Sequence, residues 1–295
     1  MISAKVIADS LSPDGVRLTT VQARIHRFIL PEITRHRVFS FSVGSSRAVP
    51  TKKIIEQVKN DPAMPVFWGK NQPGMVADEE CDEEVLLDYG IGHNFSREET
   101  WEEARDWALI HAKGFREAGY HKQLVNRLLE PFQWCDLIMT GTEWDNFFSL
   151  RIDCAAQPEI REAAIKIRKA MNESTPTQLK EGQWHRPYVD NVNDNKSGLF
   201  DDFKMNNISA ARVARVSYLN HDQTSPNVSK DLKTANRLLK DHHWSPFEHM
   251  AKPLGNDWRY NDLWPKGMTH VDHNADPWSG NLKGWVQYRQ LLEEV

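Results

Sequence analysis

The order of the predicted secondary structure elements limits which folds this chain can adopt. Residues 5–12 and 16–25 are predicted to be two strands, which the turn sequence SPDG at 12–15 joins into a pair. Several segments with helical spacing come after it, without a regular alternation of strand and helix. We therefore expect an α+β fold in which a mixed sheet packs against helices, formed by a single domain over residues 1–295.

Three helices are predicted in the middle of the chain. Ser96 and Glu99 form a capping-box pattern, and apolar residues then recur at helical spacing. These residues are Trp101, Ala104, Ala108 and Phe115. A second helix is expected over residues 121–130, ending at Pro131, and a third from Pro158, since proline suits a first helical turn. The apolar stripe of the third helix is Ile160, Ala163, Ala164, Ile167 and Met171.

The remaining segments are more irregular. Residues 61–96 are rich in proline, glycine and acids and are expected to form an insertion, and residues 174–206 a polar surface excursion. Residues 208–219 are ambiguous between helix and strand. An amphipathic helix is expected at 229–243, irregular structure at 251–279 and a closing helix at 280–295.

Composition excludes several classes of function. The net charge of −4 does not favour a nucleic-acid-binding protein. No apolar run is long enough to span a membrane, and the N-terminus lacks the features of a signal peptide. The three cysteines have no metal-type spacing and indicate reduced thiols, so we expect a cytoplasmic protein.

Positive charge and hydroxyl groups gather in the sequence RHRVFSFSVGSSR at residues 35–47. Its arginines can present planar forks of donors to an anion, and the serines around Gly44 add hydroxyl and backbone N–H groups. A solvated basic loop is the plainer interpretation, but the apolar residues interleaved through the stretch favour a half-buried phosphate site. The glycine spacing and lysine of a Walker loop are missing.

This stretch resembles the RHR-x2-S-x4-S-x-R signature of flavin-dependent thymidylate synthases. Three further stretches resemble motifs of the same family. They are HHWSPFEHM at 242–250, EWDNFFSLRIDCAAQPEIREAA at 143–164 and VNRLLEP at 125–131. The usual motif order is changed, because the PFEH sequence at 246–249 comes after the RHR sequence instead of preceding it. The simplest explanation is a circular permutation, which a fold with neighbouring termini can tolerate.

The resemblance implies a reaction and its cofactors. The family transfers a methylene carbon from methylenetetrahydrofolate to C5 of dUMP and reduces it with a hydride from FAD, which NADPH recharges. It implies no cysteine nucleophile. It also implies a homotetramer whose active sites lie between subunits.

The resemblance also assigns roles to residues. Arg151 would contact the uracil ring and stabilise negative charge on it, as the catalytic residue. The remaining nucleotide contacts would be Ser45, Ser46, Arg47, Arg127 and Glu32. The FAD contacts would be Arg35, His36, Arg37, Asn146, His243, Ser245 and Glu248.

Four positions depart from the family pattern. Glu32 replaces a glutamine, Ser42 and Val43 replace an Asn-Glu pair, and Thr142 replaces an arginine. An acid in place of an amide loses a donor and adds negative charge beside a phosphate-bearing substrate. A related pyrimidine nucleotide hydroxymethylase therefore remains an alternative, as does a non-catalytic nucleotide-binding module.

Several residues have a structural interpretation beside the functional one. Arg151 lies between apolar residues and could be a buried ion-pair partner, and His243 could interact with a helix C-terminus. Trp68 could stack on a folate or flavin ring or simply anchor its loop. The histidines at 242, 243, 249, 270 and 273 match no metal-binding spacing.

Overall fold

The computed structural model describes the chain except for a few short segments. These are residues 88–91, 191–193, 196–197, 199, 219–226, 256–263 and 293–295. None of the helices within the described part is long and apolar enough to span a membrane.

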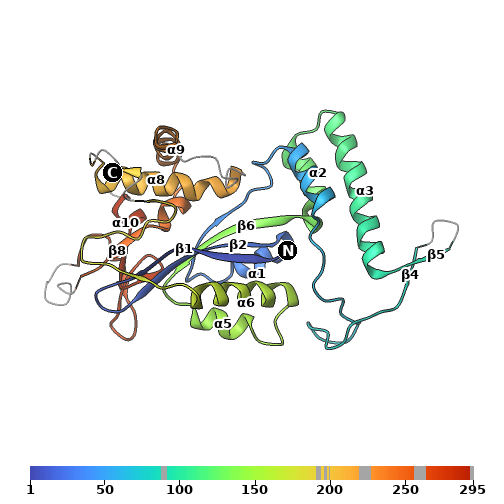
Figure 1. The fold of residues 1–295 in the computed structure, drawn as a ribbon, viewed down its shortest axis with the longest axis horizontal. Helices are drawn as coiled ribbons and strands as arrows, with labels where there is room; N and C mark the ends of the chain where they lie inside the picture. The colour runs from blue at the N-terminus through green and yellow to red at the C-terminus, as the bar shows by residue number, and fades with distance from the viewer. Residues whose placement is uncertain are drawn as a thin grey trace.

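A five-stranded sheet in the order β3-β6-β2-β1-β7 forms the centre of the molecule (Figure 1). Its strands are β1 (Ser3–Leu11), β2 (Arg17–His26), β3 (Ser40–Val43), β6 (Trp134–Gly141) and β7 (Thr177–Gln178). All neighbours are antiparallel except β1 and β7, which are parallel. The expected mixed sheet and the expected strand pair at the N-terminus are thus confirmed. Strand β3, which carries the first serines of the RHR stretch, lies at one edge.

Helices cover both faces of this sheet because side chains alternate along β6. Leu137 and Met139 face a core that includes α5 (Asp145–Arg151) and α6 (Pro158–Asn172). Ile138 faces the other side and packs against Val213 of α8 (Asp202–Ala214). Helix α6 begins at Pro158 as predicted, and its whole predicted apolar stripe is buried. The ambiguous segment from residue 208 is helical up to Ala214 and continues into a 3-10 turn, η3 (Arg215–Tyr218).

A second core lies beside the sheet, on the right of Figure 1. It is built from α2 (Thr51–Asn60), α3 (Arg97–Glu117), α4 (Lys122–Val125) and the 3-10 helix η2 (Asn126–Phe132). The capping box of Ser96 and Glu99 is present at the start of α3. The prediction that a helix ends at Pro131 was wrong, because the chain passes from α4 into η2 and Pro131 lies inside η2. Phe115 is 37% exposed, so it is not part of the buried face of α3.

The insertion at 61–96 is mostly irregular and contains one small hairpin. Its strands are β4 (Val85–Leu87) and β5 (His93–Phe95). Trp68 packs edge-on against Trp101, and Arg97 lies over its ring. Trp68 therefore anchors the insertion to α3, which supports the structural interpretation of this residue.

The C-terminal part packs against the α8 face of the sheet. The predicted amphipathic helix is α9 (Val228–Lys240), and the 3-10 helix η4 (Ser245–Glu248) comes after it. The segment expected to be irregular contains β8 (Ala251–Pro253), β9 (His270–Val271) and β10 (Pro277–Ser279). The prediction of a closing helix was wrong for most of its length, because β11 (Leu282–Lys283) and β12 (Trp285–Gln287) precede the short α10 (Tyr288–Leu292).

Two short helices lie between β2 and β3. They are the 3-10 helix η1 (Arg27–Ile29) and α1 (Leu30–Ile33).

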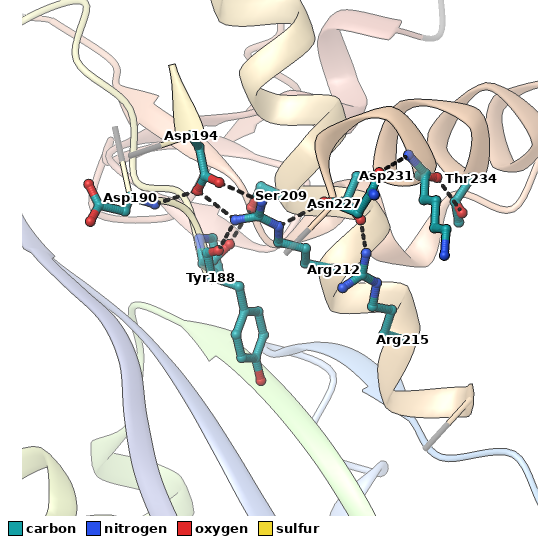
Figure 2. A network of polar contacts seen from close by, with 11 residues as sticks. Tyr188, Asp190, Asp194, Ser209, Arg212, Arg215, Asn227, Asp231 and Thr234 are labelled. Atoms are coloured by element: carbon teal, nitrogen blue, oxygen red, sulfur yellow. Dashed lines mark hydrogen bonds and ion pairs between the residues drawn. The ribbon is translucent and has the colours of Figure 1, made fainter. Parts of the chain in front are cut away.

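The prediction that residues 174–206 form a surface excursion was wrong for part of the segment, because some of its side chains are buried in the core. His185 is 1% exposed. Figure 2 shows the ion pairs that anchor Asp194: Arg212 of α8 bonds both of its carboxylate oxygens at 2.6 Å and also bonds Asp231 of α9 at 3.0 Å. Arg215 adds a second ion pair to Asp231. This network ties the polar segment to the α8–α9 pair.

Candidate active site

His36 of the RHR sequence meets Arg151 at the end of α5. The Arg151 Nε atom donates a hydrogen bond to His36 Nε2 at 2.8 Å. The imidazole is buried and lies edge-on to Phe147, with 5.0 Å between ring centroids. Burial, and then the charge of Arg151, lower the pKa of His36. His36 is therefore a neutral acceptor that orients the guanidinium of Arg151.

Three of the other predicted flavin contacts have exposed side chains and are close in sequence to His36 or Arg151. Arg35 and Arg37 flank His36 and are exposed, and Asn146 is exposed in the first turn of α5. None of the three makes a hydrogen bond or an ion pair through its side chain with a described residue. Two unpaired guanidinium groups and an amide are thus available to a ligand with anionic groups.

A second group of predicted residues gathers around a carboxylate. Ser46 donates to Glu130 Oε1 at 2.9 Å, and Arg127 donates from Nη1 to both oxygens of Glu130, at 2.9 and 3.1 Å. Arg27 of η1 lies 3.6 Å from the same carboxylate. We call these four residues the Glu130 cluster. It joins two of the predicted phosphate ligands, whereas Arg47 is exposed and Ser45 lies next to the cluster in the chain.

A cavity of about 200 Å³ opens beside the Glu130 cluster. Its lining includes Ser45, Ser46 and Arg27, together with Arg24 and Lys53. The sequence interpretation missed Arg27, Glu130 and Lys53. Glu130 lies within the VNRLLEP motif and could have been noticed there, but nothing local distinguishes Arg27 or Lys53 from ordinary surface cations.

The PFEH sequence lies against β3 within the same chain. His249 Nε2 is 3.0 Å from the Ser42 hydroxyl. The PFEH sequence and the stretch that follows the RHR sequence are therefore in direct contact. His243 and Ser245 are exposed and line a cavity of about 140 Å³ together with Ser42 and Val43. Glu248 is held in an ion pair with Arg289.

A chain of buried hydroxyl and imidazole groups crosses this face of the sheet. Its contacts run from Ser10 to His185 (2.9 Å), Thr20 (2.8 Å), Thr140 (2.7 Å), His249 (2.8 Å) and Ser42 (3.0 Å). Burial lowers the pKa of both histidines to about 3, so both are neutral. Of these residues, His249 and Ser42 lie in the motif stretches, whereas Thr20 and Thr140 are brought opposite each other by the register of β2 against β6.

Glu32 is not part of either group. It lies on α1, and its Oε2 atom is buried without a hydrogen-bond partner among the described residues. No group of three residues suited to hold a metal ion occurs in the described part of the chain.

The predicted flavin contacts are divided between the two faces of β3. On one face, Phe39 packs against Phe147 of α5, next to His36 and Arg151. On the other, Ser42 contacts His249, at the end of η4. His243 and Ser245 thus share a cavity with Ser42 and Val43, whereas His36 lies beside Arg151 and Phe147.

Comparison with known proteins places the chain in a family. The family model described as thymidylate synthase complementing protein matches residues 16–177, more than half of the 295 residues. The chain therefore belongs to this family of flavin-dependent nucleotide-modifying enzymes. The match includes the RHR sequence, Arg127, Asn146 and Arg151, and it ends before the PFEH sequence.

Two solved structures are similar to parts of the chain at low sequence identity. The UMP/dUMP methylase PolB from Streptomyces cacaoi, bound with 5-Br dUMP, is 15% identical, with a TM-score of 0.39 over 59% of this chain and 90% of that chain. The same enzyme bound with 5-Br UMP is 15% identical, with a TM-score of 0.43 over 59% and 89%. No curated protein matches the chain.

Proposed function

We propose that the protein is a flavin-dependent thymidylate synthase that converts dUMP to dTMP. One observation supports this more than any other: His36 of the RHR sequence holds Arg151 at 2.8 Å, although the two belong to separate motifs. Family membership rests on a match that includes both residues.

Arg151 is the proposed catalytic residue. Its Nε–H is used by His36, which leaves the terminal nitrogens of the guanidinium for the uracil ring. Negative charge that develops on the ring when C5 becomes nucleophilic would be stabilised by this cation. The neutral state of His36 matters here, because a protonated imidazole could not accept the bond and would repel the arginine.

Ser45, Ser46, Arg47 and Arg127 are the proposed ligands of the nucleotide phosphate. Ser46 and Arg127 converge on one point, which the Glu130 carboxylate occupies. A set of donors that holds a carboxylate can also hold phosphate oxygens. The adjacent cavity and its additional cations extend this anion-binding region.

The described residues fit the flavin in part. Arg35 and Arg37 are free to pair with the pyrophosphate of FAD, and Asn146 is free to contact the ring. When bound, FAD would supply the hydride for reduction, with NADPH and methylenetetrahydrofolate as co-substrates. The cavity of about 140 Å³ beside His243 and Ser245 is smaller than the roughly 300–1,000 Å³ of typical ligand pockets.

A homotetramer with shared active sites would reconcile these features. His243, Ser245 and Glu248 lie across β3 from the RHR sequence, so one chain does not present all the proposed flavin contacts together. A neighbouring subunit could bring one set opposite the other. The site would then be complete only in the assembly.

A pyrimidine nucleotide hydroxymethylase is the second candidate. Ser42 stands where the family has an amide, and its hydroxyl is held by buried His249. Val43 adds no polar group beside it. These changes could alter the fate of the transferred carbon.

Flavin uptake and exchange at C5 of dUMP test the proposal. The purified protein should take up FAD and show flavin absorbance, and the FAD-loaded protein should exchange the C5 hydrogen of dUMP for deuterium in heavy water. A protein that neither takes up FAD nor exchanges this hydrogen would be the non-catalytic nucleotide-binding module instead.

A further inference from the structure

The Glu130 carboxylate is bound by side chains that are also the proposed ligands of the nucleotide phosphate, or lie beside them. It accepts hydrogen bonds from Ser46 and Arg127 and lies 3.6 Å from Arg27. These donors come from three places in the chain: the segment after β3, the helix η2 and the helix η1. A single carboxylate at their meeting point acts as an internal anion.

The exposure of the Arg127–Glu130 ion pair argues against a purely structural role for it. The side chain of Arg127 is 53% exposed and that of Glu130 is 25% exposed. Ion pairs at such sites typically contribute about 0–1 kcal/mol to folding. The Arg127–Glu130 pair therefore adds little to folding, whereas the carboxylate offsets part of the positive charge that Arg127 and Arg27 would present to a ligand.

We propose that Glu130 is a built-in competitor for the substrate phosphate, which must displace it from Ser46, Arg127 and Arg27. This inference rests on the proposed nucleotide site. A phosphate monoester carries about −1.5 to −2 charges at pH 7, so it can displace a carboxylate of charge −1. A nucleoside without phosphate cannot. Glu130 would thus lower the affinity for the nucleotide and make its binding depend on the phosphate.

The experiment compares binding by the wild type with binding by two Glu130 variants and one control variant, using calorimetry on the full-length, FAD-loaded protein. Glu130→Gln keeps the shape of the side chain and an oxygen for Ser46, but removes the charge. The matched control is Glu56→Gln on α2, where Glu56 is exposed and lies 4.0 Å from Lys52. The ligands are dUMP, inorganic phosphate and 2′-deoxyuridine.

Glu130→Gln should bind both dUMP and inorganic phosphate about tenfold more tightly, because a like charge near the phosphate is removed. Its affinity for 2′-deoxyuridine should not change, and Glu56→Gln should behave as the wild type. Glu130→Asp, which keeps the charge on a shorter side chain, should tighten phosphate binding by a smaller factor. It provides the test if the glutamine variant does not fold.

Unchanged or weaker phosphate binding by the folded Glu130 variants would overturn the proposal, because Glu130 would then organise the cations instead of competing for them. Inorganic phosphate separates this result from a failure of the proposed function. If Glu130→Gln tightens phosphate binding but no variant binds dUMP, the competitor role stands and the nucleotide assignment falls.

Discussion

Arg151 donates a hydrogen bond from Nε to Nε2 of His36, and this 2.8 Å contact joins two motifs that lie 115 residues apart. The partner is a buried imidazole whose pKa is lowered by burial and by Arg151 itself. The contact therefore fixes the direction of the guanidinium without neutralising its charge. That combination suits a cation that must stabilise charge on a bound ring.

Arg151→Ala should lower turnover of dUMP by about 10²–10³-fold, the cost typical of removing one stabilising donor. FAD should remain bound, because Arg35 and Arg37 are unchanged. Turnover and flavin absorbance measured on the same samples test this prediction. Arg168→Ala, on the exposed side of α6, is the control and should retain activity. Full activity of Arg151→Ala would remove the proposed catalytic role.

Mixed oligomers can test whether the active site is shared between subunits. The variants Arg151→Ala and His243→Ala alter residues on opposite sides of β3, and each alone should be inactive. Coexpressed in one cell, they should form mixed assemblies in which some sites combine the intact halves. About a quarter of the wild-type activity would be regained if the subunits assort at random and each site draws on two chains. Continued inactivity of the mixture would place the whole site within one chain.

Acid should destabilise the protein through its two buried histidines. The pKa of His185 and of His249 is about 3 in the fold, against 6.5 when unperturbed. The unfolded chain therefore binds more protons below pH 6.5, and the fold loses up to ~1.4 kcal/mol per pH unit for each histidine as the pH falls towards 3. Urea unfolding at pH 7, 6 and 5 measures this slope.

His185→Gln should reduce that slope, since one of the two titrating groups is gone. The exposed His111→Gln variant is the control and should leave the slope unchanged. Equal slopes for all three proteins would mean that the buried histidines do not govern the acid sensitivity.

Arg212→Ala should be strongly destabilising. Arg212 is paired with Asp194 and with the fully buried Asp231, whose pKa is already raised by burial (Figure 2). Removing one partner of a buried ion pair typically costs about 3–5 kcal/mol, because the remaining charge is left uncompensated. Urea unfolding at pH 7 measures the loss. Lys52→Ala, which breaks an exposed pair, should cost less than about 1 kcal/mol.

Local patterns predicted the fold well wherever a segment forms its structure from its own residues. The capping box of Ser96, the proline at the start of α6 and the turn at 12–15 all act over a few residues. The C-terminal segment was predicted poorly because its strands are very short and pair with other segments: β12 pairs with β8 and β11 with β10. Pairing of two- or three-residue strands leaves almost no local pattern.

The site was predictable only in part for the same reason. Motifs identified His36 and Arg151, but their contact depends on how α5 packs on the sheet. Thr20 and Thr140 look like ordinary strand residues, and only the register of β2 against β6 places them opposite each other. Likewise, only the fold brings Glu130 within hydrogen-bonding distance of Ser46.

The mass of the nucleotide product tests the central claim most directly. The FAD-loaded protein should be incubated with dUMP, methylenetetrahydrofolate and NADPH, and the nucleotide then analysed by mass spectrometry. We expect dUMP that has gained one methyl group at C5, with none formed when the folate is omitted. Recovery of unchanged dUMP from FAD-loaded protein, or of a hydroxymethyl product alone, would contradict the proposed thymidylate synthase activity.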